Sequence, residues 1–359
     1  MYHIVTNNYQ EMISKRFSLS IIIRMVYVYR KVVKTISQYS KIYEYTTRDG
    51  KRITDTKTLN YIVSLKIPPA YEKVEINLNK SSKLLATGFD VKGKKQYIYN
   101  QSWIDSQKMR KYCKMIDFGK QIQKISADAD AVLKMNLNGG EGDRRKYMIA
   151  IILKLIMSCN FRIGNSIGKN VYNSYGVSTL NKSHVQQNGN DVVINFRGKK
   201  GVQNTCKIRD TALSNIMKKL KTQSKNENTQ LFVDDDNIAI TSNDVNEHLK
   251  KYGNFSSKDF RTWFANTIFI TEIQKNLGAN NAGEKIITRK KIAKDAISKT
   301  AELLHHTVAI CKKKYINPEL IELYINSPAE FHKIAKNKTP EEAFICYLET
   351  QKICGGKNK

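Results

Sequence analysis

The sequence predicts an α+β protein, in which a small β-rich N-terminal lobe precedes a mainly α-helical domain. Three observations carry this prediction. Residues 42–99 contain short segments of alternating apolar and polar residues separated by turn signals, as half-buried strands do. From about residue 115 onwards, apolar residues recur at helical spacing. The later strand candidates are too short and too few for a second large sheet.

The first lobe begins with β-branched and aromatic residues and ends near Trp103. Its expected elements are a strand over 42–46, a helix over 56–65, a strand over 74–78 and two hairpin strands over 84–89 and 95–99. Asp49-Gly50 is a strong hairpin-turn signal after the first strand. Pro68-Pro69 ends the helix, because proline cannot continue one. The polar and basic stretch 105–114 is the expected hinge to the second domain.

Helices dominate the second domain. They are expected over 118–133, 147–159, 210–220, 242–252, 258–274 and 288–305, with short strands at 177–180, 192–196 and 205–208 and a Gly- and Asn-rich loop at 136–142. The helix over 147–159 is apolar nearly all round, so we expect it to be buried. Asp210 and Ser242 are N-cap candidates, and Asn317-Pro318 begins one more helix.

The charge balance points to a polyanionic partner. Lys and Arg number 61 against 32 Asp and Glu, which gives a formal net charge of +29. Each phosphate that such a chain neutralises releases counterions and adds affinity. An anionic membrane is the rival partner, but no run of about 18 apolar residues exists to span one. The first 30 residues also lack the pattern of a signal peptide.

The six cysteines are scattered through the chain and form no CxxC pair. This arrangement gives neither a zinc-binding spacing nor a secreted disulfide framework. We therefore expect reduced thiols.

Three cations stand where elements begin or end. Arg162 follows the most apolar helix, where its guanidinium either snorkels or is held rigidly to bind two phosphate oxygens. Lys199 lies in a basic turn between two strand candidates, which is either a general DNA-binding feature or a way to bring an ammonium to a leaving oxygen. Arg261 adjoins Trp263 on a packed helix face, unless it forms a surface ion pair with Asp259.

His306 and Tyr315 complete the set. A histidine at a helix end is often a satisfied core or cap residue, but the helix dipole there would favour its cationic form. Tyr315 follows Lys312–Lys314, cations that favour a phenolate and hold phosphate. These residue types can bind a phosphodiester and attack it with a phenol.

In that order and local context, the five residues resemble the catalytic pentad of type IB DNA topoisomerases, in the compact poxvirus, giant-virus and bacterial branch. The resemblance covers about residues 42–326. In the first lobe it rests on Ile67-Pro68-Pro69-Ala70-Tyr71, Ala86-Thr87-Gly88-Phe89-Asp90 and Gln96-Tyr97-Ile98-Tyr99. In the second domain it rests on Arg162-Ile163-Gly164-Asn165, Tyr175-Gly176-Val177-Ser178-Thr179-Leu180, Phe196-Arg197-Gly198-Lys199, Asp244-Val245-Asn246 and Lys258-Asp259-Phe260-Arg261-Thr262-Trp263.

The resemblance implies a catalytic domain with the type IB topoisomerase/tyrosine recombinase fold and a small β-hairpin sheet. It also implies that Tyr315 attacks the scissile phosphorus, forms a 3′-phosphotyrosyl link and expels a 5′-hydroxyl. The non-bridging oxygens would be bound by Arg162, Arg261 and His306. Lys199 would protonate the departing oxygen.

Further positions follow from the same resemblance. Lys258 and Asn266 would support the catalytic residues. The residues that would contact DNA are Gln96, Tyr97, Tyr99 and Lys169. Exchange of one phosphodiester for another conserves bond energy, so the resemblance implies no metal, no nucleotide and no organic cofactor. The implied partner is double-stranded DNA, clamped by a monomer and without a membrane. The implied location is intracellular: a viral factory or virion for a virus, the cytoplasm and nucleoid for a bacterium.

Four parts of the chain are expected on this basis. They are a basic extension of unassigned order over 1–40, a β-rich DNA-binding lobe over 41–110, a helical catalytic domain over 111–330, and a C-terminal helix and basic tail over 331–359.

Two departures from the family pattern stand out. Asn165-Ser166-Ile167-Gly168-Lys169 replaces a more basic helix, which leaves the cleavage-site preference open. His305 stands where the family usually has glycine, so either His305 or His306 could be the phosphate ligand. The spacing of nine residues to Tyr315 favours His306.

Two other functions compete with this interpretation. Tyrosine recombinases share the catalytic fold, but they usually carry histidine at the position of Lys258 and a helical N-terminal domain, whereas residues 42–103 are β-rich. A non-catalytic architectural DNA-binding protein is the third possibility, and the presence of all five candidate residues argues against it.

Overall fold

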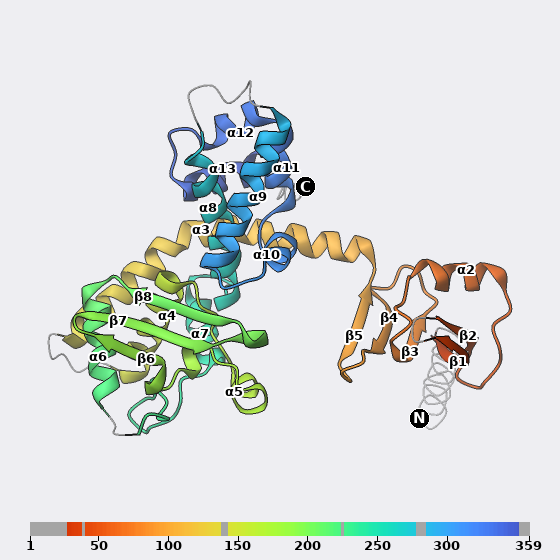
Figure 1. The fold of residues 1–359 in the computed structure, drawn as a ribbon, viewed down its shortest axis with the longest axis horizontal. Helices are drawn as coiled ribbons and strands as arrows, with labels where there is room; N and C mark the ends of the chain where they lie inside the picture. Colours follow the sequence, from red (N-terminus) through yellow and green to blue (C-terminus); the bar gives the residue numbers. More distant parts are fainter. Residues whose placement is uncertain (1–26, 38–39, 138–142, 224–225, 278–284, 352–359) are drawn as a thin grey trace, which may run out of the picture. The chain divides into compact units, whose positions relative to one another are not determined.

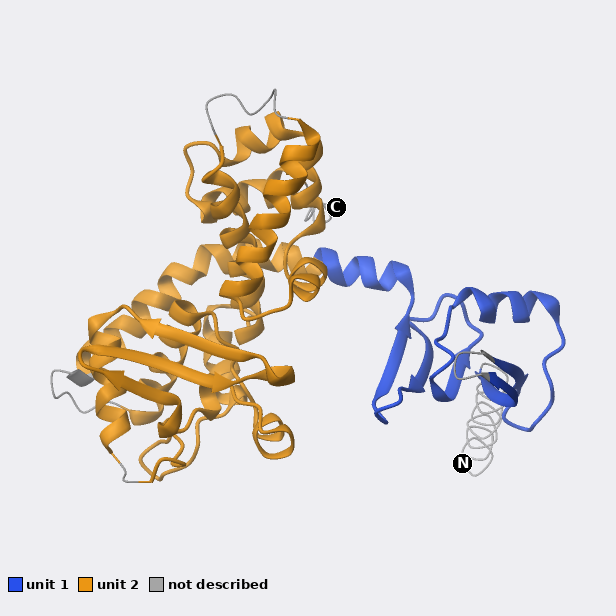
Figure 2. Cartoon of the chain, viewed as in Figure 1, with its two compact units in different colours: residues 1–109 blue, residues 110–359 orange. Residues whose placement is uncertain are grey.

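The computed structural model describes residues 27–37, 40–137, 143–223, 226–277 and 285–351. The chain divides into two compact units, residues 1–109 and 110–359 (Figure 2). Their boundary falls inside one long helix, α3 (Gln101–Leu137). The stretch 105–114, the expected hinge, is therefore continuous helix.

The first unit is built on one antiparallel sheet with the strand order β2-β1-β3-β4-β5 (Figure 1). Its strands are β1 (Tyr27–Ser37), β2 (Ser40–Thr46), β3 (Glu72–Asn77), β4 (Leu84–Phe89) and β5 (Lys95–Tyr99). One cross-strand row of apolar side chains runs from Val28 through Ile76 and Ala86 to Ile98. With Ile62 of helix α2 (Thr56–Ser64), this row forms the core of the unit.

Strand β1 was not expected, because residues 1–40 show no clear period. Arg30 holds this strand in the unit. Its guanidinium donates hydrogen bonds to the carbonyls of Ile67, Pro68 and Tyr71, and lies 4.4 Å from the centroid of the Tyr43 ring. Residues 1–26 of the expected extension lie outside the described residues.

The prediction of a β-hairpin at Asp49-Gly50 is wrong. Strand β2 pairs with β1, and after the turn the chain makes only one isolated bridge, Thr46 to Arg52, before it enters α2. The local turn signal is real, since Gly50 donates to the Thr47 carbonyl with φ +86°. It marks a turn, but no strand follows it.

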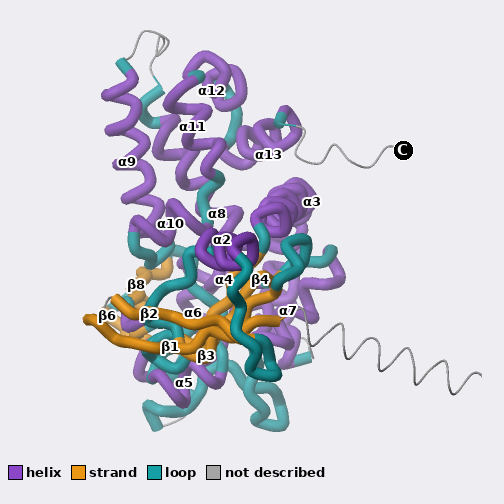
Figure 3. Tube along the Cα trace, turned by 90° about the vertical axis from the view of Figure 1, so that its right-hand side faces the viewer, coloured by secondary structure: helices purple, strands orange, loops and turns teal. Residues whose placement is uncertain are grey.

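The second unit combines helices with a three-stranded sheet (Figure 3). Its helices after α3 are α4 (Arg144–Cys159), α5 (Ser166–Tyr172), α6 (Thr211–Thr222), α7 (Ser242–Leu249), α8 (Ser257–Gln274), α9 (Ile286–Leu303), α10 (Val308–Lys314), α11 (Pro318–Asn326), α12 (Pro328–Ala335) and α13 (Pro340–Thr350). The sheet has the order β6-β7-β8, with strands β6 (Val185–Asn188), β7 (Asp191–Arg197) and β8 (Gln203–Ile208). The expected strand over 177–180 is instead a 3-10 turn, η1 (Val177–Thr179).

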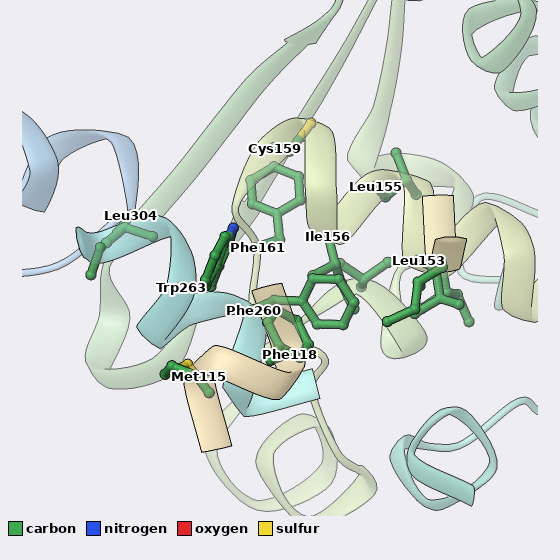
Figure 4. Packing of buried hydrophobic residues seen from close by; sticks show 14 of the residues in the cluster. Met115, Phe118, Leu153, Leu155, Ile156, Cys159, Phe161, Phe260, Trp263 and Leu304 are labelled. Atoms are coloured by element: carbon green, nitrogen blue, oxygen red, sulfur yellow. The ribbon is translucent and has the colours of Figure 1, made fainter. Parts of the chain in front are cut away.

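The core of this unit packs α3, α4 and α8 together. Helix α4 is buried along most of its length, as its sequence predicts. Phe118 of α3 makes edge-to-face contacts with Phe260 and Trp263 of α8 (Figure 4). A Cβ at Gly119 would lie 2.3 Å from the Trp263 ring, so the two helices approach too closely there for any larger residue. This packing fixes α8, which carries Arg261.

Disulfide bonds at Cys113, Cys159 and Cys206 correct the expectation of reduced thiols. Cys159, at the end of α4, and Cys206, in β8, form a disulfide across a sequence separation of 47. Cys311 and Cys346 are free thiols. On a separate point, none of the described helices is both long enough and apolar enough to cross a membrane.

Candidate active site

Four of the five candidate residues meet in the second unit. Arg162 comes from the loop after α4, Arg261 from near the start of α8, His306 from the turn between α9 and α10, and Tyr315 from the C-terminal cap of α10. Arg162 Nη2 lies 2.7 Å from His306 Nδ1, and Arg261 Nη2 lies 2.6 Å from His306 Nε2. The rings of His306 and Tyr315 are 4.5 Å apart, measured between centroids.

This cluster has more hydrogen-bond donors than acceptors. A guanidinium only donates, and a neutral imidazole accepts at only one of its two nitrogens. In one of the two short contacts to His306, a guanidinium N–H therefore faces the imidazole N–H, so two donors meet. Within the described part of the chain, neither Arg162 nor Arg261 is paired with a carboxylate. The site is arranged to receive an anion.

Arg261 is held rigidly below the surface. Its side chain is 4% exposed, and it donates to the backbone carbonyls of Asn160 and Leu304. Its Nε is buried without a partner. The alternative ion pair with Asp259 does not form, because that carboxylate binds Lys114 at 2.7 Å and caps α8. Burial, and secondly the charge of Arg162, lowers the pKa of Arg261 to about 10, which leaves it cationic at neutral pH.

The segment that carries Arg162 packs directly on the turn at η1. Val177 N donates to the Arg162 carbonyl at 2.8 Å, and Ser178 N donates to the Ile163 carbonyl at 2.8 Å. Gly164 has a φ of +85°, and a Cβ on Gly176 would lie 2.4 Å from Gly164 N. The segments that begin at Arg162 and at Tyr175, on which the resemblance rests, thus pack against each other through their backbones.

Helix α9 ends in a Schellman motif that separates the two adjacent histidines. His306 N donates to the Ala301 carbonyl at 2.8 Å, and His305 N donates to the Glu302 carbonyl at 3.0 Å. His305 occupies the left-handed position with a φ of +52°. The motif turns His306 toward the two guanidiniums, while His305 Nε2 meets the Cys159 carbonyl at 3.2 Å.

The expected cationic form of His306 is wrong. Burial, followed by the charges of Arg261 and Arg162, lowers the pKa of His306 to about 2. The residue lies beyond the last turn of α9 and just before Thr307, the N-cap of α10, so no C-terminal helix dipole compensates. We therefore expect a neutral imidazole at neutral pH.

Asn266 fixes the backbone around Tyr315. Its side chain is 0% exposed, and its amide donates to the carbonyls of Thr262 and Tyr315 at 2.7 and 3.1 Å. Its oxygen accepts from Asn317 N at 2.8 Å. The chain on both sides of Ile316 is therefore tied to α8, the helix that also carries Arg261.

Comparison with known proteins agrees with this geometry. A model of the family described as "Eukaryotic DNA topoisomerase I, catalytic core" matches residues 95–339, and one described as "Bacterial DNA topoisomerase IB, N-terminal domain" matches residues 42–90. The chain is 30% identical over 309 residues to a DNA topoisomerase 1B of Acanthamoeba polyphaga mimivirus, which covers 84% of this chain and 90% of the relative.

The chain belongs to the type IB DNA topoisomerase family. A DNA topoisomerase 1B of vaccinia virus, strain Copenhagen, is 22% identical over 292 residues, 77% of this chain and 88% of the relative. A DNA topoisomerase 1 of rabbit fibroma virus is 22% identical over 304 residues, 80% of this chain and 90% of the relative. The predicted fold class and the choice of topoisomerase over recombinase are confirmed at the level of family.

Lys199 and Lys258 stand apart from the four clustered residues. Lys199 lies in the turn between β7 and β8, and its side chain is exposed. Lys258 lies in the first turn of α8 and is also exposed. In the described residues, no hydrogen bond joins either ammonium to the cluster. The base of the β7–β8 hairpin does approach the segment that carries Arg162, because the Phe196 and Phe161 ring centroids are 4.8 Å apart.

The DNA-contact candidates of the first unit lie on one aromatic ladder. Tyr97, which is 51% exposed, stacks on Tyr99, and Tyr99 stacks on Trp103 at 4.4 Å between centroids. Lys83 Nζ lies 4.5 Å from the Trp103 ring centroid. Gln96 donates to Asp90 at 2.8 Å, so its amide is partly engaged within the lobe. Their contact with DNA stays a prediction.

Lys169 of the second unit lies in α5 and donates to Gln230 at 3.2 Å. Asn160, which sequence reasoning missed, is the αL cap of α4 at φ +52°, and its carbonyl receives Arg261. Asparagine directly after a long apolar helix is the signal that could have revealed this cap.

Proposed function

We propose that this chain relaxes supercoiled duplex DNA by cutting and rejoining one strand. The phenol oxygen of Tyr315 forms a bond to the scissile phosphorus as the bond from phosphorus to the 5′-oxygen breaks. The phenol gives up its proton to solvent water, and the departing 5′-oxygen gains one from the Lys199 ammonium, which solvent then reprotonates. The reverse exchange rejoins the strand after rotation, so bond energy is conserved and neither ATP nor a metal ion is required.

The donor excess around His306 is the observation that supports this reaction best. A phosphodiester placed between Arg162, Arg261 and His306 would supply the acceptors that the cluster lacks, and would pair the buried Nε of Arg261. The same donors would bind the non-bridging oxygens as charge develops in the transition state. The centroid of the Tyr315 ring lies 4.5 Å from that of His306, so the phenol would stand beside that phosphate.

Lys199 fits the role of general acid through its hairpin. The Lys199 ammonium is exposed on the short turn between β7 and β8. It can therefore contact bound DNA and then donate its proton. Proton donation of this kind contributes about 10²- to 10⁴-fold in rate. Lys258, exposed on the first turn of α8, is proposed to assist the transfer.

The parts of the chain receive matching roles in this proposal. Residues 41–110 would be the DNA-binding lobe, with Gln96, Tyr97 and Tyr99 against the duplex, and residues 111–330 the catalytic domain with Lys169 as a further contact. The enzyme would act as a monomer that clamps the duplex. The named relatives are viral, which supports action inside an infected cell, in a viral factory or virion.

Relaxation of supercoiled plasmid without ATP and with EDTA tests the proposal. The wild-type protein should relax both negative and positive supercoils, and denaturation with detergent should trap DNA on Tyr315. The Tyr315→Phe variant should form no adduct yet bind duplex DNA within about twofold of wild type, since only one hydroxyl is lost. A matched control, Tyr97→Phe, should still form the adduct.

Three outcomes would contradict the proposal. An adduct that persists in Tyr315→Phe would assign the nucleophile elsewhere. Mobility shifts without nicking would indicate an architectural protein, and strand exchange between paired sites would indicate a recombinase.

A further inference from the structure

The ring of His305 makes contacts that its backbone does not require. The left-handed position of a Schellman motif is suited to glycine, which carries no Cβ. A histidine persists there when its surroundings over-determine the strained conformation. His305 has a φ of +52° and is half-buried, so contacts of its side chain must compensate for the strained backbone.

Two such contacts exist, and both reach the segment that carries Arg162. His305 Nε2 lies 3.2 Å from the Cys159 carbonyl, and because a carbonyl only accepts, Nε2 must bear the proton. The His305 ring also lies 5.2 Å from the Phe161 ring, measured between centroids. Cys159 ends α4 and Phe161 directly precedes Arg162 in the sequence; Figure 4 shows the side chains of both residues.

The backbone of His305 adds a third connection. Its carbonyl faces Arg162 Nη1 at 3.4 Å, while the next residue, His306, meets Arg162 Nη2 at 2.7 Å. The turn between α9 and α10 and the loop after α4 are therefore joined by a hydrogen bond, a ring contact and the guanidinium itself. These two segments supply two of the proposed phosphate-binding groups.

We infer that His305 is a positioning residue, which holds the loop of Arg162 in register with His306. It acts through Arg162 and does not itself touch the phosphate. This inference rests on the proposed function, because it assigns a means of aligning two groups of that site. A misplacement of about 1 Å at such a site can cost on the order of 10²-fold in rate.

The test uses His305→Gly and His305→Asn in the full chain. Both residues tolerate the left-handed conformation, and neither carries the ring, so the Schellman backbone is retained. The rate of plasmid relaxation at saturating enzyme should fall by about 10- to 100-fold in both variants. Binding of duplex DNA, measured with Tyr315→Phe added, should stay within about twofold, because phosphate contacts elsewhere dominate affinity.

A double-mutant cycle with Arg162→Lys separates positioning from general support of the fold. If His305 acts through Arg162, His305→Gly should slow the Arg162→Lys enzyme by less than about twofold, since coupled residues are non-additive. His332→Ala on α12 is the matched histidine control and should leave relaxation unchanged. If His305→Gly fails to fold, His305→Asn carries the same comparison.

Two results would overturn the inference. Relaxation at the wild-type rate in both variants would show that the ring has no positioning role. An equal loss in the wild-type and Arg162→Lys backgrounds would show that His305 does not act through Arg162. Both are distinct from failure of the proposed function, in which the wild-type protein itself forms no Tyr315 adduct.

Discussion

At the residue scale, Asn266 connects the backbone of Tyr315 to the helix of Arg261. Its buried amide spans Thr262, Tyr315 and Asn317 with three hydrogen bonds of 2.7 to 3.1 Å. No other side chain in the described residues bonds the main-chain groups of both Tyr315 and Asn317. The orientation of the phenol thus depends on one amide that never touches the substrate in our proposal.

Replacing Asn266 with Asp should damage both stability and cleavage. The substitution keeps the shape but sets a carboxylate oxygen against two carbonyls, which should cost about 1–3 kcal/mol or more for lost buried hydrogen bonds. Adduct formation should slow at least tenfold, because the Tyr315 carbonyl loses its hydrogen bond to residue 266. A tenfold slower rate corresponds to an activation free energy higher by ~1.4 kcal/mol. Thermal unfolding and single-turnover adduct formation measure the two effects. Asn254→Asp, at an exposed bend, is the control, and equal behaviour of both variants would refute the anchoring role.

The neutral state of His306 predicts an acid-sensitive protein. An unfolded histidine binds a proton below its ordinary pKa near 6.5, whereas burial beside Arg261 and Arg162 holds the pKa of His306 in the fold to about 2. Between these values the unfolded state binds more protons, so the free energy of unfolding should fall as pH drops below about 6.5. The slope for one such histidine is at most about 1.4 kcal/mol per pH unit, reduced by the partial exposure of the ring.

Thermal unfolding between pH 5 and 8 measures this dependence. His306→Gln should show a shallower loss on the acid side, although burial also lowers the pKa of His248 and His184 and leaves a residual slope. Saturating duplex DNA should reduce the loss, because a bound phosphate would stabilise the imidazolium. An unchanged slope in His306→Gln would contradict the prediction.

Several site residues were predictable because local sequence constrains them. Arg162 and Arg261 each adjoin strongly apolar elements, which indicates an ordered cation. The conformation of His305 and the protonation of His306 were not predictable. Both depend on which distant groups, such as the Cys159 carbonyl and Arg261, pack against them.

At the element scale, the loop of Arg162 owes its shape to η1. The two segments approach so closely that Gly164 and Gly176 face each other without side chains. Two consecutive backbone hydrogen bonds cross this contact, since the Arg162 and Ile163 carbonyls accept from Val177 N and Ser178 N. The loop after α4 therefore has little freedom to adjust.

Gly176→Ala should separate these segments and displace Arg162. The new Cβ would lie 2.4 Å from Gly164 N, and backbone cannot yield as a flexible side chain can. We expect a loss of about 1–3 kcal/mol or more in unfolding free energy, together with at least a tenfold slower relaxation. Gly189→Asn, at an open turn with φ +59°, is the control. Wild-type activity in Gly176→Ala would show that the contact does not position Arg162.

Two of the three predicted helix starts carry the expected cap, whereas α7 is capped by Thr241 and Ser242 is its first helical residue. Asp210 caps α6, and Asn317 with Pro318 begins α11, as predicted. Strand β1 escaped prediction because one of its pairing partners, β3, and the carbonyls that Arg30 binds lie far along the chain. The strand expected at 177–180 became a 3-10 turn, since its backbone groups bond the Arg162 segment in place of a neighbouring strand.

At the scale of the whole molecule, a net charge of +29 predicts strongly salt-dependent binding of DNA. If about 6–10 phosphates are neutralised, affinity should fall by about 10³- to 10⁵-fold between 50 and 200 mM salt. Fluorescence anisotropy with the Tyr315→Phe variant, titrated against labelled duplex, measures this slope. A logarithmic slope shallower than about −3 would contradict an extensive phosphate interface. Lys312→Gln tests one contributing cation and should reduce the slope by about one.

The disulfide between Cys159 and Cys206 makes part of the second unit a covalent ring. The ring includes Arg162, α5, η1 and the whole β7–β8 turn with Lys199. A protease that cuts once inside it would leave both fragments attached until a thiol reductant is added. Two of the five proposed catalytic side chains, Arg162 and Lys199, would thus stay covalently linked through the disulfide even after the chain is cut between them.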